Sequence, residues 1–67
     1  MNKKALELYQ EYQSGKLEVN KLINELADLC ERKECREEEL IDAEVEAGIF
    51  IIPTLAAGVE LELYFRE

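Results

Sequence analysis

Residues 17–29, LEVNKLINELADL, constrain the fold of this chain more than any other segment. Apolar side chains recur there at helical spacing and form one stripe: Val19, Leu22, Ile23, Leu26, Leu29 and Cys30. The opposite side is polar: Asn20, Lys21, Asn24, Glu25 and Asp28. This pattern is typical of an amphipathic helix that buries one face. We therefore predict a central helix on which the rest of the chain packs.

A first helix is predicted over residues 2–13, where Ala5, Leu8, Tyr9 and Tyr12 share one side. Gly15 can adopt the left-handed conformation that closes a helix C-terminus. The central helix is predicted over residues 18–33. The connection between the two helices is therefore short, and they should be antiparallel neighbours.

The apolar stripe of the central helix lapses at Lys33 and Glu37 and resumes at Leu40. Two arrangements stay open. Either one long helix extends to about residue 47, or a break near residues 34–35 precedes a third helix over residues 36–47. We favour the break, because a charged middle turn would bury nothing.

After Gly48 the periodicity changes from helical to strand-like. Residues 49–52, IFII, form an apolar run that Pro53 ends. Residues 59–66 alternate strictly, which is typical of a strand with one buried face. We expect strands over residues 49–53 and 59–66, joined as a hairpin. The predicted fold is α+β, with two or three N-terminal helices followed by a C-terminal β-hairpin, in one small domain over residues 1–67.

This hairpin would leave two open strand edges, and two strands alone are marginal in water. Pairing of edges between copies would cover them and enlarge the small core of a 67-residue chain. We therefore expect a homodimer or a higher homo-oligomer. The residues expected to mediate self-association belong to the last strand: Val59, Leu61, Leu63, Tyr64 and Phe65.

The chain has a net charge of −8, from 16 acidic and 8 basic residues. Direct binding to nucleic acid needs clustered Lys and Arg and is disfavoured, whereas a basic protein partner is favoured. The candidate partner-binding residues form an acidic ridge: Glu31, Glu34, Glu37, Glu38, Glu39 and Asp42. Such a ridge can imitate a phosphate backbone, and the alternative is an ordinary solvated helix face.

Few groups suited to catalysis are present. The chain has no histidine, its only serine is Ser14, and its three glycines are isolated, so we predict no enzyme activity, no cofactor and no metal site. Cys30 and Cys35 would point to different faces of a continuous helix, and only a break between them would allow a disulfide. We expect Cys30 in the core and Cys35 as a free thiol. No apolar stretch suits a membrane span or a signal peptide, which predicts a cytoplasmic protein.

The tail EVEAGIFIIPTLAAGVELELYF, residues 44–65, resembles the end of a loose group of small phage and prophage proteins. In that group a short helix leads into a glycine, an apolar run, a proline, a second glycine and an alternating strand. Here these are Gly48, residues 49–52, Pro53, Gly58 and residues 59–65. The resemblance by itself implies no activity. It favours a phage accessory protein, located in the host cytoplasm, and small acidic proteins of that kind often bind and block host or defence proteins.

These observations lead to one functional hypothesis and two alternatives. The hypothesis is a non-enzymatic acidic protein-binding module, a phage-type inhibitor of a host or defence protein with a basic site. The first alternative is an oligomer that sequesters a small ligand, such as a nucleotide signal, between its protomers. The second alternative is a small structural or assembly protein.

Overall fold

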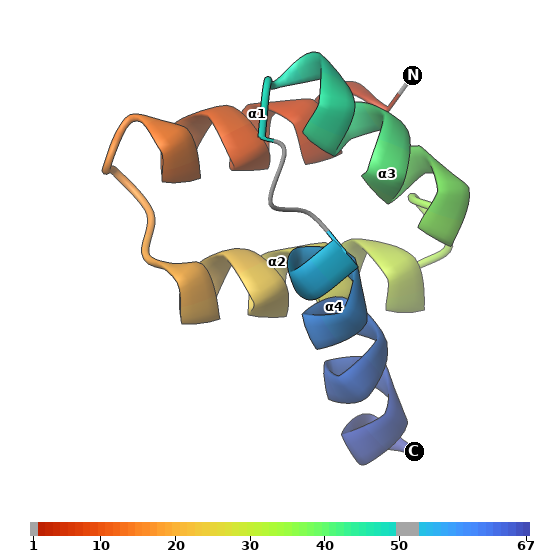
Figure 1. Cartoon of the computed structure of the whole chain (residues 1–67). Helices are drawn as coiled ribbons and strands as arrows, with labels where there is room; N and C mark the ends of the chain where they lie inside the picture. The colour runs from red at the N-terminus through yellow and green to blue at the C-terminus, as the bar shows by residue number, and fades with distance from the viewer. Residues whose placement is uncertain (1, 50–52) are drawn as a thin grey trace.

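The computed structural model describes residues 2–49 and 53–67 and contains four helices there (Figure 1). They are α1 (Lys3–Gln13), α2 (Val19–Glu31), α3 (Glu37–Glu46) and α4 (Pro53–Arg66). Helices α1 and α2 form a hairpin, α3 packs mainly on α1, and α4 packs mainly on α2. The C-terminal end of α4 stands away from α1 (Figure 1).

Two residues after the last residue of each of the first three helices, the chain has a positive φ: Gly15 (84°), Lys33 (63°) and Gly48 (78°). The backbone N–H of the next residue then bonds to a carbonyl of the preceding turn, at 2.9, 2.9 and 3.1 Å respectively. This is the Schellman arrangement, which satisfies carbonyls that the helix end leaves free. Lys33 adopts it at a cost of about 1 kcal/mol, because its side chain disfavours this conformation. The resulting break separates α2 from α3.

All four helices contribute to one core. Its buried apolar residues are Ala5, Tyr9, Leu22, Leu26, Ala27, Leu29, Cys35, Leu40, Ala43, Leu55 and Val59. Three leucines of the predicted central stripe are among them, so α2 lies at the centre of the packing. The stripe is not buried evenly, because Val19 at the start of α2 remains 40% exposed.

The predicted α+β fold is wrong, because residues 59–66 lie in α4 and the described residues contain no strand. Leu55 and Val59 are buried and Leu63 is half-buried, which is the spacing of one helix face. Pro53 is the first residue of α4. Proline is favoured at this position because the first backbone N–H groups of a helix have no partner within the helix, so the N–H that proline lacks is not missed. The expected strand over residues 49–53 falls largely on residues 50–52, which lie outside the described residues.

The expected helix ranges 2–13, 18–33 and 36–47 differ from the bounds of α1, α2 and α3 by at most two residues. The inference of self-association from open strand edges was built on the hairpin. Because α4 is helical, that inference loses its basis.

Helices α2 and α4 approach closely at Gly58, where a Cβ atom would lie 2.9 Å from Cδ1 of Ile23. Gly58→Ala should gain about 0.5–1 kcal/mol in helix propensity but push the end of the Ile23 side chain aside. Ile23→Val removes that terminal methyl. We therefore expect the Gly58→Ala/Ile23→Val chain to be about 0.5–1 kcal/mol more stable than the sum of the single changes. Urea denaturation of the four chains measures this coupling, and strictly additive effects would show that the methyl does not limit the helix approach.

Candidate protein-binding surface

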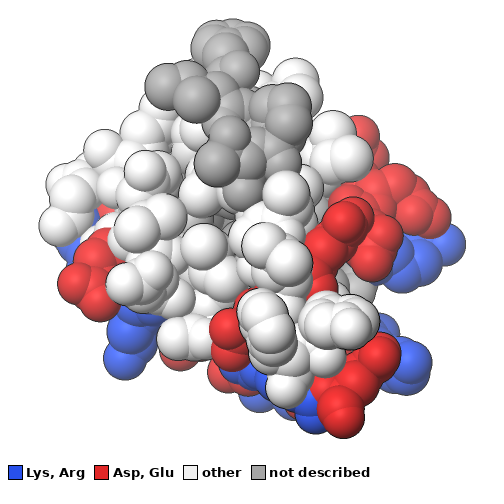
Figure 2. All heavy atoms as spheres, turned by 60° about the horizontal axis from the view of Figure 1, so that its bottom comes forward, with Lys and Arg blue, Asp and Glu red and all other residues white. Residues whose placement is uncertain are grey.

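Helix α4 carries large apolar side chains on its outer side. Leu61, Tyr64 and Phe65 are 57%, 70% and 77% exposed, and their spacing places them on one face, which we call the α4 stripe. The rings of Tyr64 and Phe65 meet edge to face, with centroids 5.7 Å apart. Figure 2 turns this end of the molecule forward and shows uncharged residues gathered in the centre, with acidic and basic residues at the border. Large apolar side chains exposed at helical spacing mark interaction sites.

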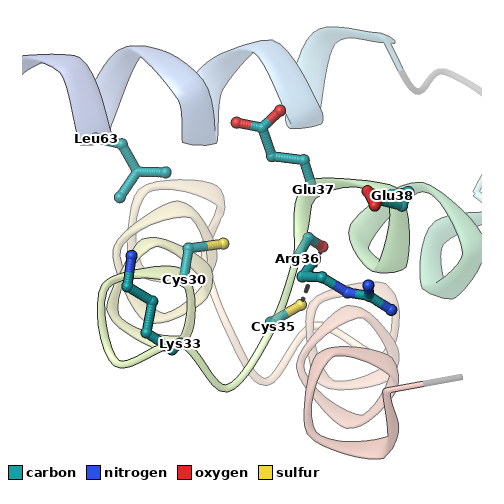
Figure 3. Close-up of a pocket in the computed structure, with 7 residues that line it drawn as sticks. All are labelled: Cys30, Lys33, Cys35, Arg36, Glu37, Glu38 and Leu63. Atoms are coloured by element: carbon teal, nitrogen blue, oxygen red, sulfur yellow. Dashed lines mark hydrogen bonds between the residues drawn. The ribbon is translucent and has the colours of Figure 1, made fainter.

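A groove adjoins the stripe between α4 and the start of α3. Its largest hollow has a volume of about 570 Å³ and is lined by Cys30, Lys33, Cys35, Arg36, Glu37, Glu38 and Leu63 (Figure 3). The Glu37 side chain points toward α4, and Leu63 points back from α4 (Figure 3). Two further hollows are also lined by Glu37 and Glu60. One of them is lined in addition by Tyr64 and Glu67, and the other by Ile41 and Ala56. Together these hollows form the α3–α4 groove, and Tyr64 makes it continuous with the stripe.

The structure divides the acidic ridge into paired and unpaired carboxylates. The pairs are Glu31 with Arg66 (2.7 Å), Glu34 with Arg32 (2.7 Å) and with Lys4, and Glu39 with Arg36 (3.4 Å). The contact with Lys4 lowers the pKa of Glu34, and the backbone N–H of Arg36 lowers the pKa of Glu39. Glu37, Glu38 and Asp42 have no ion pair within the described residues. Two of these three, Glu37 and Glu38, line the α3–α4 groove.

Arg66 attaches the end of α4 to the end of α2. Its Nη1 lies 2.7 Å from Glu31 and 2.7 Å from Asp28, and its Nε lies 3.2 Å from Glu62. Hydrogen bonds to Glu31 and Asp28 raise the pKa of Arg66 further above its already high value. These contacts join the C-terminal end of α4, which carries the α4 stripe, to the C-terminal end of α2.

A buried polar pair, which the sequence did not reveal, joins α1 to α3. Tyr9 and Glu44 are both 0% exposed, and the Tyr9 hydroxyl donates to Oε1 of Glu44 at 2.7 Å. Oε2 of Glu44 has no hydrogen-bond partner among the described residues. Burial raises the pKa of Tyr9 and that of Glu44. Glu44 follows Leu40 by four residues, so the two residues share the buried face of α3. This spacing was the one signal in the sequence from which the burial of Glu44 could have been predicted.

Both cysteines are free thiols, as expected for Cys35, but their burial is the reverse of the expectation. Cys35 is the buried one, at 4% exposure, and Cys30 is half-buried at the end of α2. Burial raises the pKa of Cys35 to about 12 and also raises the pKa of Cys30. A thiol with a raised pKa is mostly protonated at neutral pH, and the nucleophilic form of cysteine is the thiolate.

The residues expected to mediate self-association divide into two sets on α4. Val59 is buried and Leu63 is half-buried, whereas the other three form the exposed α4 stripe. They therefore do not make a strand edge.

Within residues 2–49 and 53–67, no cluster of three or more Cys, Asp or Glu side chains is placed to hold a metal ion. The helices of these ranges are all too short or too polar to cross a membrane. Comparison with protein-family models, with curated proteins and with solved structures found no match to this chain.

Proposed function

We propose that this chain is a non-enzymatic protein-binding module that holds a cationic amphipathic helix of a partner protein. The α4 stripe and the α3–α4 groove form the binding surface. The observation that carries this proposal is the exposure of Tyr64 and Phe65, at 70% and 77%, beside a groove that is lined by Leu63 and by the carboxylates of Glu37, Glu60 and Glu67. Aromatic side chains of this kind supply much of the binding energy at protein interfaces.

Charge identifies the kind of partner. Glu37, Glu38, Glu60 and Glu67 line the groove, and the whole chain carries a net charge of −8. A helix with an apolar stripe flanked by Lys and Arg would place its own stripe on α4 and its cations on these carboxylates. A second copy of this chain would bring more carboxylates to the same surface, which like-charge repulsion disfavours.

The state of the polar groups within the described residues supports a binding role rather than catalysis. The chain has no histidine, both thiols have a raised pKa, and the Ser14 hydroxyl donates to the backbone carbonyl of Glu11 at 3.1 Å. Covering a basic site on a host or defence protein is the form of this function that the resemblance to phage proteins favours.

A synthetic amphipathic helix of leucine and lysine tests the proposal, because it carries the proposed chemistry and nothing else. We expect the purified chain to bind this peptide, and the affinity to fall as salt is added. Tyr64→Ala/Phe65→Ala should weaken binding at least about 30-fold, because one such residue often contributes about 2 kcal/mol. Val19→Ala is the matched control, since Val19 is an exposed apolar residue of α2 that lines none of the three hollows of the groove.

Three comparisons make the outcome decisive. A peptide of the same composition without an apolar face should bind weakly, and a leucine–glutamate helix should not bind. Equal binding of the two lysine peptides would contradict the proposal, because it would show attraction to net charge alone. Light scattering of the free chain gives the oligomeric state, and a dimer abolished by Tyr64→Ala/Phe65→Ala would show that a second copy occupies the stripe instead.

A further inference from the structure

Cys30 and Cys35 face a common space in the structure. Cys30 lies in the last turn of α2, and Cys35 lies in the connection just before α3. The left-handed residue Lys33 reverses the chain between them, so the two side chains line the same pocket (Figure 3). The break that a disulfide between these residues requires is therefore present.

We propose that Cys30 and Cys35 form a modification site, at which exchange with a small disulfide such as oxidised glutathione joins them in an intramolecular disulfide. Both side chains line one pocket, and each thiol is among the causes of the shifted pKa of the other. The disulfide ties the end of α2 to the segment before α3, and it fixes the wall of the pocket that faces Leu63.

The exposure of the two thiols sets the order of the reaction. Cys30 is half-buried and lines two hollows, whereas Cys35 is 4% exposed. The Cys30 thiolate attacks one sulfur of oxidised glutathione, a mixed disulfide forms, and one glutathione leaves as its thiolate. The Cys35 thiolate then attacks Sγ of Cys30, and the second glutathione leaves. The protons from both cysteines end on the two glutathiones, so two thiols are oxidised and one disulfide is reduced.

The surroundings of the pair make the exchange slow at neutral pH. Burial raises the pKa of both thiols, and only a thiolate can attack a disulfide. The charged groups around them are Glu31, Lys33, Arg36, Glu37, Glu38, Glu39, Arg66 and Glu67. Most of these are acidic, which also disfavours the thiolate. The rate should therefore rise as the pH rises above neutral.

The experiment treats the reduced full chain with oxidised glutathione, at neutral and at mildly alkaline pH, and follows the intact mass after acid quenching. We expect a product that has lost two hydrogen atoms and retains no glutathione, formed faster at the higher pH. The Cys35→Ser chain should keep one glutathione on Cys30. The Cys30→Ser chain should react most slowly, because its remaining thiol is buried.

Measurements on the unsubstituted chain decide the proposal even if a variant folds poorly. If folding favours formation of this disulfide, then by linkage the disulfide stabilises the folded chain to the same extent. The oxidised chain should therefore unfold at a higher urea concentration than the reduced chain. A lasting glutathione adduct on the unsubstituted chain would overturn the proposal. So would a disulfide-linked dimer, or an oxidised chain that unfolds at lower urea.

Discussion

Tyr9→Phe is expected to destabilise the protein by about 3 kcal/mol. The change removes one hydroxyl and leaves both carboxyl oxygens of Glu44 buried without a donor among the described residues. An unsatisfied buried polar group costs about 1–3 kcal/mol, and more when it is charged. Small domains are stable by only about 5 kcal/mol or a little more, so this single hydroxyl supports a large part of the total. Urea denaturation followed by circular dichroism measures the loss.

The double variant Tyr9→Phe/Glu44→Met distinguishes two causes of this destabilisation, the unpaired carboxyl group of Glu44 and a loss of packing. Methionine is flexible and close in length to glutamate, so it can fill the space between α1 and α3 without a polar atom. Replacing both members of a buried polar pair with apolar groups is often nearly neutral. We expect the double variant to recover most of the stability that Tyr9→Phe loses. A double variant as unstable as Tyr9→Phe would place the effect in packing instead.

The pH dependence of stability provides a second control for this pair. Burial raises the pKa of Glu44 in the folded chain above its unfolded value. Its contribution to stability is then fully present below the unfolded pKa and is lost as the pH rises through the folded pKa. Glu34 and Glu39 behave in the opposite way, because their lowered pKa makes their contribution disappear as the pH falls. Stability curves of the unsubstituted chain and Glu44→Gln should therefore diverge with rising pH, and parallel curves would contradict the assignment.

The first three helices could be located from the sequence because local signals agreed there. Apolar stripes gave the faces, and the glycines at 15 and 48 gave two of the ends. The end of α2 carried no such signal, because a lysine occupies its left-handed position. Only the charged interruption of the stripe indicated the break.

The last helix was assigned wrongly because its pattern fits two periods. Val59, Leu61, Leu63 and Phe65 alternate as in a strand, yet positions 59 and 63, and positions 61 and 65, are also one helical turn apart. Ala56, Ala57 and the run of Leu and Glu favour a helix, and Pro53 suits a helix start. The contact of α4 with α2 involves residues far apart in the sequence, which periodicity alone cannot reveal.

The sequence pointed to some residues of the candidate surface but not to their arrangement. Leu61, Tyr64 and Phe65 were named as association residues, and the structure exposes all three, but on a helix face rather than a strand edge. The acidic ridge was named as one unit, and half of it is neutralised. The ion pair of Glu31 with Arg66 joins residues 35 positions apart, so no local pattern could predict it.

An aspartate at position 59 and an aspartate at position 61 should have very different effects, and this contrast distinguishes a helix from a strand. Val59 is 0% exposed against α2, so Val59→Asp would bury a carboxylate without a cationic partner and should cost about 3 kcal/mol or more. Leu61 is 57% exposed, so Leu61→Asp should change stability by only about 0.5 kcal/mol. A strand over residues 59–66 would instead place both residues on one inward face and predict similar losses. Urea denaturation of the two variants measures the difference, and equal losses would contradict the helical assignment of α4.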